Sequence, residues 1–225
     1  MWKELTNLWR SDDLLEQAWN KSFDMLEIAQ EMYVEAVRIL RESNDTVVNR
    51  EIRQKDKYVN KYEEEVRRKV MTHCTMQGSE KLSGGMVLVS IVIDIERIGD
   101  YCKNILDLAE AHPARLAVGT YEDSLKRIEQ EVKSRFKETI SVLKNQDVAK
   151  AEEMMGTFKM EVSSICDNIV NELVKGSSDG LSSSDTVALA LYARYLKRIS
   201  AHLNNMITSV VNPFERIGFR ATEET

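Results

Sequence analysis

The chain has 225 residues, of which 43% are hydrophobic and 30% charged, so it can bury a core and is not expected to be disordered. Its net charge of −6 argues against unaided binding to nucleic acid or broad adsorption on anionic lipid, because both need a basic surface. Only 9 glycines and 2 prolines interrupt a composition rich in good helix formers, which indicates an all-α protein.

No segment predicts secretion or a membrane span. The N-terminus lacks a basic stretch followed by an apolar signal core. The most apolar run, residues 86–93, ends at Asp94 and is far shorter than the about 20 residues that a transmembrane helix needs. The cysteines, at positions 74, 102 and 166, are odd in number and widely spaced, which does not suggest a disulfide framework. We therefore expect a soluble, cytoplasmic protein with three buried or half-buried thiols.

The first half of the chain predicts three long helices. Apolar residues recur at three- and four-residue steps over residues 14–40, which is the pattern of a helix with one buried face. Polar or glycine-containing breaks separate this helix from a second, expected at about 46–76, and a third, expected at about 81–111. The third helix is the most apolar, so we expect it to be central.

The second half predicts three more helices. The fourth is expected to begin at 119–120 and to end near Asn145. The fifth begins at Asp147, the expected N-cap, and ends before a Ser/Gly-rich loop at 176–184. The sixth is expected to be capped by Ser184 or Asp185, at the end of that loop.

The two halves repeat one another. Residues 95–105 reappear, altered, as residues 196–206, and Pro113 and Pro213 follow the two copies 100 residues apart. A proline ends a helix, so each copy closes with a helix that stops just before its proline.

Short links between long helices make neighbouring helices antiparallel. The predicted fold is therefore all-α, with two tandem antiparallel three-helix bundles related by an internal duplication of about 100 residues. We place the first repeat at 1–113 and a second, degenerate repeat at 114–225.

Two pairs of oxygen-bearing side chains stand out in the first repeat. Glu96 and Asp100 are four residues apart and share one face of the most apolar helix, and Asp56 and Asn60 have the same spacing on the preceding helix. Hard oxygen ligands suit magnesium, manganese, calcium or non-haem iron, and bundles often build metal sites from facing helices. The sequence therefore predicts a metal site formed by Asp56, Asn60, Glu96 and Asp100.

The same carboxylates allow an interpretation without metal, in which Glu96 and Asp100 only pair with Arg53 or Arg97. Asp94 points to a different side of the helix and is expected at the surface or in a salt bridge. The acidic run at 63–65, followed by basic residues, is expected to be a solvated, ion-paired face.

The second copy lacks these ligands. Lys197 and Ala201 stand where the first copy has Glu96 and Asp100. On the fifth helix the positions of the other pair are filled by Lys159 and Ser163. Protonated lysine does not bind metal and alanine has no donor, so a second site of this kind is excluded.

Further motifs of enzymes are missing. His73, His112 and His202 do not have the spacing of zinc ligands; we expect His73 to be exposed and His112 to lie at a helix end. The sequence contains no phosphate-binding loop, nucleophile elbow or dinucleotide fingerprint.

Gly84 and Gly85 are expected to permit a close helix approach or fraying of the helix end. A carboxylate-bridged, metal-dependent hydrolase or oxidase is the less favoured alternative to a non-enzymatic protein, because no general base is evident.

The segment from Asp94 to Asp100 with Asn104-Ile105 closely resembles the "DLERIGDxxxNI" signature of the PhoU family, and the likeness extends over both repeats. The resemblance implies a cytoplasmic, often dimeric, non-enzymatic regulator of phosphate uptake and phosphate-starvation signalling. Its expected partners are a phosphate transporter of the ABC type and a membrane sensor kinase, and it would meet the membrane only through them. Some PhoU-like domains accompany sodium–phosphate cotransporters instead.

The resemblance also implies metal binding, with iron, zinc, manganese or magnesium as candidates. Glu96 and Asp100 match the family motif fully and Asp56 matches, whereas Asn60 replaces a usual aspartate. In the second repeat only His202 and Asn205 keep the family pattern.

The N-terminal segment is rich in aromatic residues, with Trp2, Trp9 and Trp19. Two interpretations stay open. The tryptophans pack against their own bundle, or they form an apolar arm used for dimerisation or docking.

Overall fold

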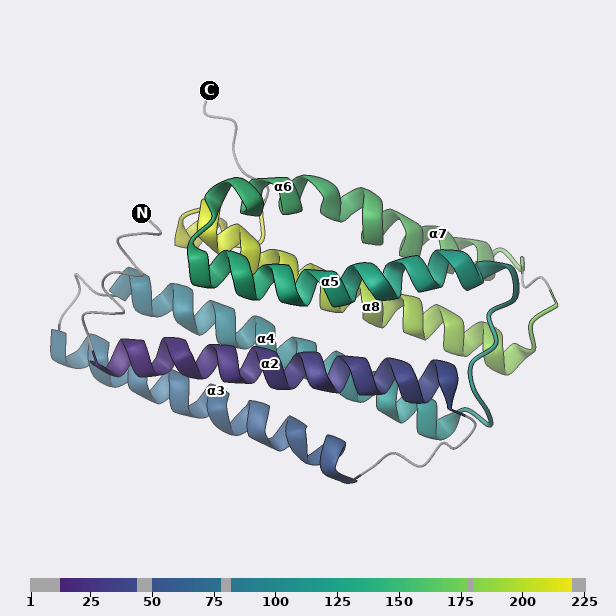
Figure 1. Cartoon of the computed structure of the whole chain (residues 1–225), viewed down its shortest axis with the longest axis horizontal. Helices are drawn as coiled ribbons and strands as arrows, with labels where there is room; N and C mark the ends of the chain where they lie inside the picture. Colours follow the sequence, from purple (N-terminus) through teal and green to yellow (C-terminus); the bar gives the residue numbers. More distant parts are fainter. Residues whose placement is uncertain (1–12, 44–49, 78–81, 178–179, 220–225) are drawn as a thin grey trace.

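The computed structural model describes residues 13–43, 50–77, 82–177 and 180–219, and these ranges are almost entirely helical (Figure 1). The helices are α2 (Asp13–Glu42), α3 (Arg50–Gln77), α4 (Leu82–Ala111), α5 (Glu122–Asn145), α6 (Val148–Phe158), α7 (Ser164–Val174) and α8 (Ser183–Val211). Short 3-10 turns lie at Gly119–Tyr121 and Phe214–Arg216. The described ranges contain no strand, so the predicted all-α class is confirmed.

Helices α2, α3 and α4 form one bundle, and α5, α6, α7 and α8 form the other (Figure 1). Helix α4 packs against α2 and α3 of its own repeat and against α8 of the other, while α8 contacts α4, α5, α6 and α7. The last helix of each repeat is therefore central, as predicted. Helix α3 and the α6–α7 pair lie at opposite outer edges of the molecule.

The hydrophobic core continues across both repeats. Helix α4 contributes Val87, Leu88, Ile91, Val92 and Ile95 to it, which explains why this helix is so apolar. Near its beginning, α4 approaches α3 closely. A Cβ atom added to Gly85 would lie 2.8 Å from Val70 Cγ1, so the predicted close helix approach at this glycine is confirmed.

The helix boundaries agree closely with the sequence pattern, with one clear correction. Asp147 caps α6, because its Oδ1 accepts a hydrogen bond of 3.0 Å from the backbone N–H of Lys150. Helix α8 is capped by Ser182 rather than by Ser184 or Asp185: the Ser182 hydroxyl accepts from the Asp185 backbone N–H at 3.0 Å. The expected start of the second helix at 46 lies outside the described residues.

The predicted fifth helix is interrupted by a π turn at Lys159–Ser163, between α6 and α7. Met154, which precedes the turn, and Val162, which lies within it, are both buried and are eight positions apart. Two regular α-helical turns take about seven positions, so the π turn accommodates one extra residue. This places Val162 on the core face of the helix.

Trp19 is buried and meets Phe23 edge to face, with ring centroids 4.7 Å apart. This supports packing against the bundle for that residue, whereas Trp2 and Trp9 lie outside the described residues. The cysteines are free, with Cys102 and Cys166 buried and Cys74 half-buried, as expected. Burial raises the pKa of the Cys166 thiol to about 12. Among the described residues no helix is long and apolar enough to cross a bilayer.

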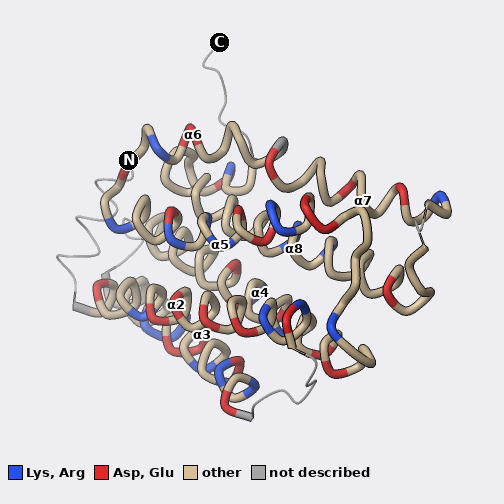
Figure 2. Tube along the Cα trace, turned by 45° about the vertical axis from the view of Figure 1, so that its right-hand side comes forward, with Lys and Arg blue, Asp and Glu red and all other residues tan. Residues whose placement is uncertain are grey.

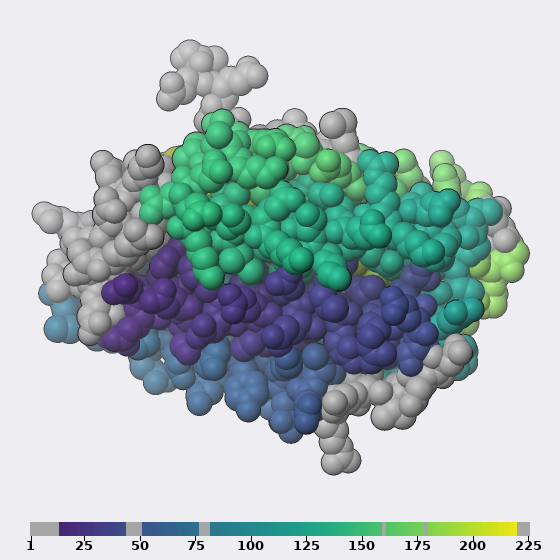
Figure 3. All heavy atoms as spheres, viewed as in Figure 1, coloured from purple at the N-terminus to yellow at the C-terminus, as the bar shows by residue number. Residues whose placement is uncertain are grey.

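The space-filling view shows α2 and α5 side by side across one broad face of the molecule (Figure 3). The two helices run antiparallel, since Lys144 at the end of α5 pairs with Glu27 in the middle of α2, whereas Glu122 at the start of α5 pairs with Arg41 near the end of α2. This seam joins the first repeat to the second.

Candidate functional site

The structure brings three of the four predicted site residues together on the face shared by α3 and α4. Asp56 is buried on α3, and Glu96 and Asp100 lie half-buried on α4. Both Asp100 and Asp56 act electrostatically on Glu96, which shows that they are near one another. Asn60, one turn beyond Asp56, is exposed.

A further member of this group, Glu63, was not predicted from the sequence. It was expected on a solvated face, but it is 9% exposed and faces the same carboxylates. Burial raises the pKa of Glu63, and the charges of Glu64 and Asp100 raise it further, against the lowering effect of Arg67 and Arg97. Its position seven residues after Asp56, two helical turns along one face, is the signal that could have identified it.

Burial also raises the pKa of Glu96. The negative charge of Asp100 adds to this, as do the weaker effects of Glu63 and Asp56, while Arg97 opposes them. The four acidic residues, hereafter the carboxylate cluster, are Asp56, Glu63, Glu96 and Asp100. Burial and the neighbouring negative charges make the ionised forms of Glu63 and Glu96 unfavourable, which favours a positive partner.

Basic side chains already partner each member of the carboxylate cluster. Arg97 reaches Glu96 at 3.5 Å and Asp100 at 3.3 Å. Lys103 lies 3.7 Å from Asp56, and Arg67 lies 2.6 Å from Glu63. The sequence alternative of pairing with Arg97 is therefore observed. The alternative of pairing with Arg53 is not observed, because Arg53 binds Asp107 at 2.8 Å and also contacts Glu110.

The carboxylate cluster has the oxygen chemistry that suits a hard cation, but its present geometry does not hold one. Within the described residues, no group of three His, Cys, Asp or Glu side chains is placed to bind a single ion. A metal would have to displace Arg97 and Lys103 from the carboxylates and draw these closer together. Acidic and basic residues are in any case interspersed along α2 and α3 rather than segregated (Figure 2).

The second repeat carries an ion pair where the first has clustered acids. Lys197, the counterpart of Glu96, lies 2.5 Å from Asp167 on α7. Arg194 approaches the same carboxylate at 3.9 Å. The structure thus places a lysine–aspartate ion pair in the second repeat at the position where the first repeat has clustered carboxylates.

A buried polar contact joins the two repeats between α4 and α8. The Asp94 carboxylate lies 2.7 Å from His202 Nδ1 and accepts a hydrogen bond of 3.2 Å from the Asn205 amide. Asp94 is thus not at the surface, and its buried contact with His202 is a salt bridge, the other expected place, when the imidazole is protonated. The His202 ring also stacks on Tyr101, with centroids 5.8 Å apart. The sequence did not assign a partner to His202, and the structure shows that Asp94 is its partner.

The other two histidines lie outside this contact, one buried in α3 and one just after α4. His73 was expected at the surface, and this prediction is wrong because only 1% of the residue is exposed. His112 lies just after α4, as predicted, with Nδ1 2.6 Å from the Ala114 carbonyl and Nε2 3.3 Å from Asp185. Neither histidine adds to the carboxylate cluster.

The family model described as the PhoU domain matches twice, over residues 23–109 and 125–210. The crystal structure of PhoU from Pseudomonas aeruginosa has a similar fold, with a TM-score of 0.78 over 88% of this chain and 95% of that one. The two sequences are 19% identical, so this likeness concerns the fold alone. No curated protein sequence matches the chain.

Proposed function

Because the chain belongs to the PhoU family, we propose that it is a non-enzymatic regulator of phosphate uptake and phosphate-starvation signalling. The observation that carries this proposal is the double match of the family model, once to each three-helix repeat. A role in phosphate regulation in general follows from the family, and the specific mode of action is our inference. The protein acts by contact with other proteins.

In this proposal the protein works at the cytoplasmic side of the membrane, as a homodimer. Its partners are a phosphate transporter, either ABC-type or sodium-coupled, and a membrane sensor kinase. The fold suits such a role, since long antiparallel helices present extended, mixed-charge faces on which other helices can pack.

A deletion strain tests the regulator. We expect loss of the chain to raise phosphate uptake and the activity of a phosphate-starvation promoter in phosphate-rich medium, and the wild-type gene to restore both. The transporter class is resolved by repeating the uptake assay in strains that lack either the ABC-type or the sodium-coupled system. Unchanged uptake and unchanged promoter activity after deletion would rule out the regulator.

Metal binding at the first repeat is a second candidate function. The raised pKa values of Glu96 and Glu63 favour it, because a cation would relieve the repulsion among the carboxylates. The residues proposed to hold the ion are Asp56, Asn60, Glu96 and Asp100, with Glu63 alongside. The ion would supply positive charge that orders the face shared by α3 and α4.

Elemental analysis of protein purified without chelator tests this candidate. We expect iron, zinc, manganese or magnesium in the wild type, and its loss in Glu96→Ala and Asp100→Ala. The same change in Asp167, which is paired with Lys197 in the second repeat, is the matched control and should leave metal content unaltered. Metal-dependent turnover of a phosphate ester or of oxygen would favour the enzyme alternative instead.

A further inference from the structure

A groove runs along the seam between α2 and α5, and one end of it extends across α2 to Ile52 and Lys55 of α3. It consists of two adjoining hollows of about 580 Å³ and about 640 Å³. Both are lined by Val34 of α2 and Lys133 of α5, so they form one continuous depression. The groove therefore lies where the first repeat meets the second, on the broad face formed by α2 and α5 (Figure 3).

The floor of the groove is apolar along its middle. Val34 is 38% exposed and Val37, one turn on, is half-buried. Beneath them Tyr33 packs against Phe136, with ring centroids 5.4 Å apart, and so closes the seam to the core. An exposed and a half-buried valine between two helices offer apolar contact area to a third helix.

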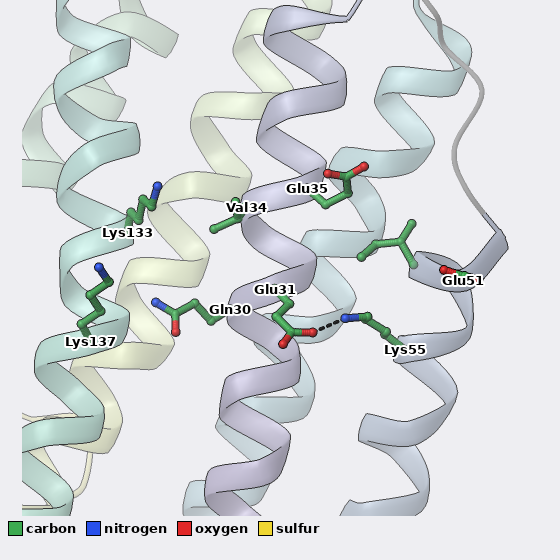
Figure 4. A pocket seen from close by; sticks show the side chains of 9 residues that line it. Gln30, Glu31, Val34, Glu35, Glu51, Lys55, Lys133 and Lys137 are labelled. Carbon is green, nitrogen blue, oxygen red and sulfur yellow. Dashed lines mark hydrogen bonds and ion pairs between the residues drawn. The ribbon is translucent and has the colours of Figure 1, made fainter.

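One wall of the groove is basic. Lys126, Gln130, Lys133 and Lys137 follow one another at helical spacing on α5, and all four side chains are exposed. Figure 4 shows Lys133 and Lys137 on the side of α5 that faces Gln30 and Val34 of α2. Among the described residues neither of these two lysines has an ion-pair or hydrogen-bond partner.

Four of the acidic residues that line the groove are paired with basic side chains. Glu31 binds Lys55, Glu35 binds Arg38, and Arg41 holds both Glu122 and Glu129 (Figure 4 shows the first of these pairs). These carboxylates are thus not available to Lys133 and Lys137. Two like charges four residues apart repel each other, and an added negative group would relieve this repulsion.

We propose that this groove binds an acidic amphipathic helix of the membrane partner. The inference rests on the proposed function, and it names the surface and the chemistry of that contact. The partner helix would place apolar residues on Val34 and Val37 and carboxylates against Lys133 and Lys137. The distance along α5 from Lys126 to Lys137 is about 16 Å at 1.5 Å per residue, which is the length of three helical turns.

Two features favour a helix over other occupants. An apolar floor with a charged wall is the arrangement by which grooves hold amphipathic helices, through anchors at three- and four-residue spacing. Glu31 and Glu35 on the α2 side bind their own basic partners, so Lys133 and Lys137 on the α5 side supply the attraction, and a helix can direct its carboxylates to that one side.

Co-flotation of the full chain with membrane vesicles tests the proposal. The vesicles carry the phosphate transporter and sensor kinase of the native cell, and protein-free vesicles of the same lipids are the blank. We expect Lys133→Glu/Lys137→Glu to bind at least about tenfold more weakly than the wild type, because two attractive charge contacts become repulsive. Lys57→Glu/Lys61→Glu, the same change at the same spacing on exposed α3 positions, is the matched control and should bind like the wild type.

A second variant, Val34→Asp, tests the apolar floor and is expected to weaken binding as well, while circular dichroism confirms that each variant is folded. If both groove variants bind as strongly as the wild type, the groove proposal is wrong and the proposed regulatory function stands. Absence of any wild-type binding would count against the regulator itself. Binding to the protein-free vesicles, or a change of self-association caused by Lys133→Glu/Lys137→Glu, would assign the groove to lipid or to a second copy and overturn the proposal.

Discussion

Glu96 carries a charge that opposes folding at neutral pH. Its pKa is raised by burial and by Asp100, so the native state takes up a proton at a higher pH than the unfolded chain, whose value is near 4.5. Ionised Glu96 therefore destabilises the fold, and this effect fades as the pH falls through the folded pKa. We expect Glu96→Gln to raise the free energy of unfolding by about 0.5 kcal/mol at neutral pH, as measured by urea unfolding.

The pH dependence distinguishes this effect from a change in packing. The advantage of Glu96→Gln should disappear at roughly pH 4, where the wild-type carboxyl is protonated in both states. Glu64→Gln, an exposed position on α3, is the control and should change stability little at either pH. An advantage of equal size at both pH values would show that charge repulsion is not the cause.

Added manganese allows a second test of the role of Glu96. A metal that binds only the native state raises its stability. Manganese should therefore raise the urea midpoint of the wild type more than that of Glu96→Gln. The order of stability of the two proteins would then reverse at high metal concentration.

At the scale of single elements, glycine has opposite roles in two helices. A Cβ at Gly85 would meet Val70 Cγ1 at 2.8 Å and Cys74 Sγ at 2.9 Å, whereas a Cβ at Gly156 would meet nothing within 4 Å. We expect Gly85→Ala to destabilise the protein by about 1–3 kcal/mol through overpacking of α3 against α4. Gly156→Ala should stabilise α6 by about 0.5–1 kcal/mol, because alanine is the better helix former.

Thermal unfolding of the two variants measures both effects. The opposite signs are the essential result, because a helix-propensity effect alone would stabilise both variants. A Gly85→Ala protein more stable than the wild type would show that α3 and α4 can separate at this point without loss.

The π turn between α6 and α7 predicts an unusual tolerance to deletion. Removing Lys159 would leave seven positions between Met154 and Val162, which a regular α-helix places on one face. We expect this deletion to lower stability by only about 1–2 kcal/mol. Deletion of Asn168, an exposed residue within α7, should cost more than about 4 kcal/mol, because Ile169 and Leu173 would turn away from the core.

Urea unfolding followed by circular dichroism compares the two deletions. Equal losses would indicate that the π turn is required for the register of the core. Buried Arg135 is the reason to expect some loss, since it binds Glu161 at 2.8 Å and Thr157 Oγ1 at 3.1 Å across this turn.

Local patterns were sufficient for the helices and for part of the site. Apolar periodicity and the polar breaks predict α2 to α5 and α8, and the four-residue spacings bring Asp56, Glu96 and Asp100 together because α3 and α4 are antiparallel neighbours. The π turn was not predictable, since it changes the period by a single residue. Glu63 was assigned to solvent because the acidic run around it resembles a surface.

Contacts between the repeats depend on packing that no local pattern contains. Asp94 and His202 are 108 residues apart in sequence, and they meet only because α4 lies against α8. The groove between α2 and α5 has the same origin. A boundary between residues 113 and 114 stays a prediction, and the continuous core gives a physical reason to test whether the halves are independent.

At the scale of the whole molecule, the shared core and the buried Asp94–His202 contact predict that both repeats unfold in one transition. The chain allows a direct test, because Trp19 is buried in α2 of the first repeat and residues 114–225 contain no tryptophan. Tryptophan fluorescence therefore follows the first repeat only, while far-ultraviolet circular dichroism follows both. The two urea curves of the wild type should coincide.

His202→Ala extends the test across the interface. It leaves the buried Asp94 carboxylate with Asn205 alone, and we expect a loss of about 2 kcal/mol. Although His202 belongs to the second repeat, coupled repeats require the tryptophan curve of the first to shift by the same amount as the dichroism curve. If the tryptophan curve stays in place while the dichroism curve splits into two steps, the repeats are separate folding units and residues 1–113 should fold alone.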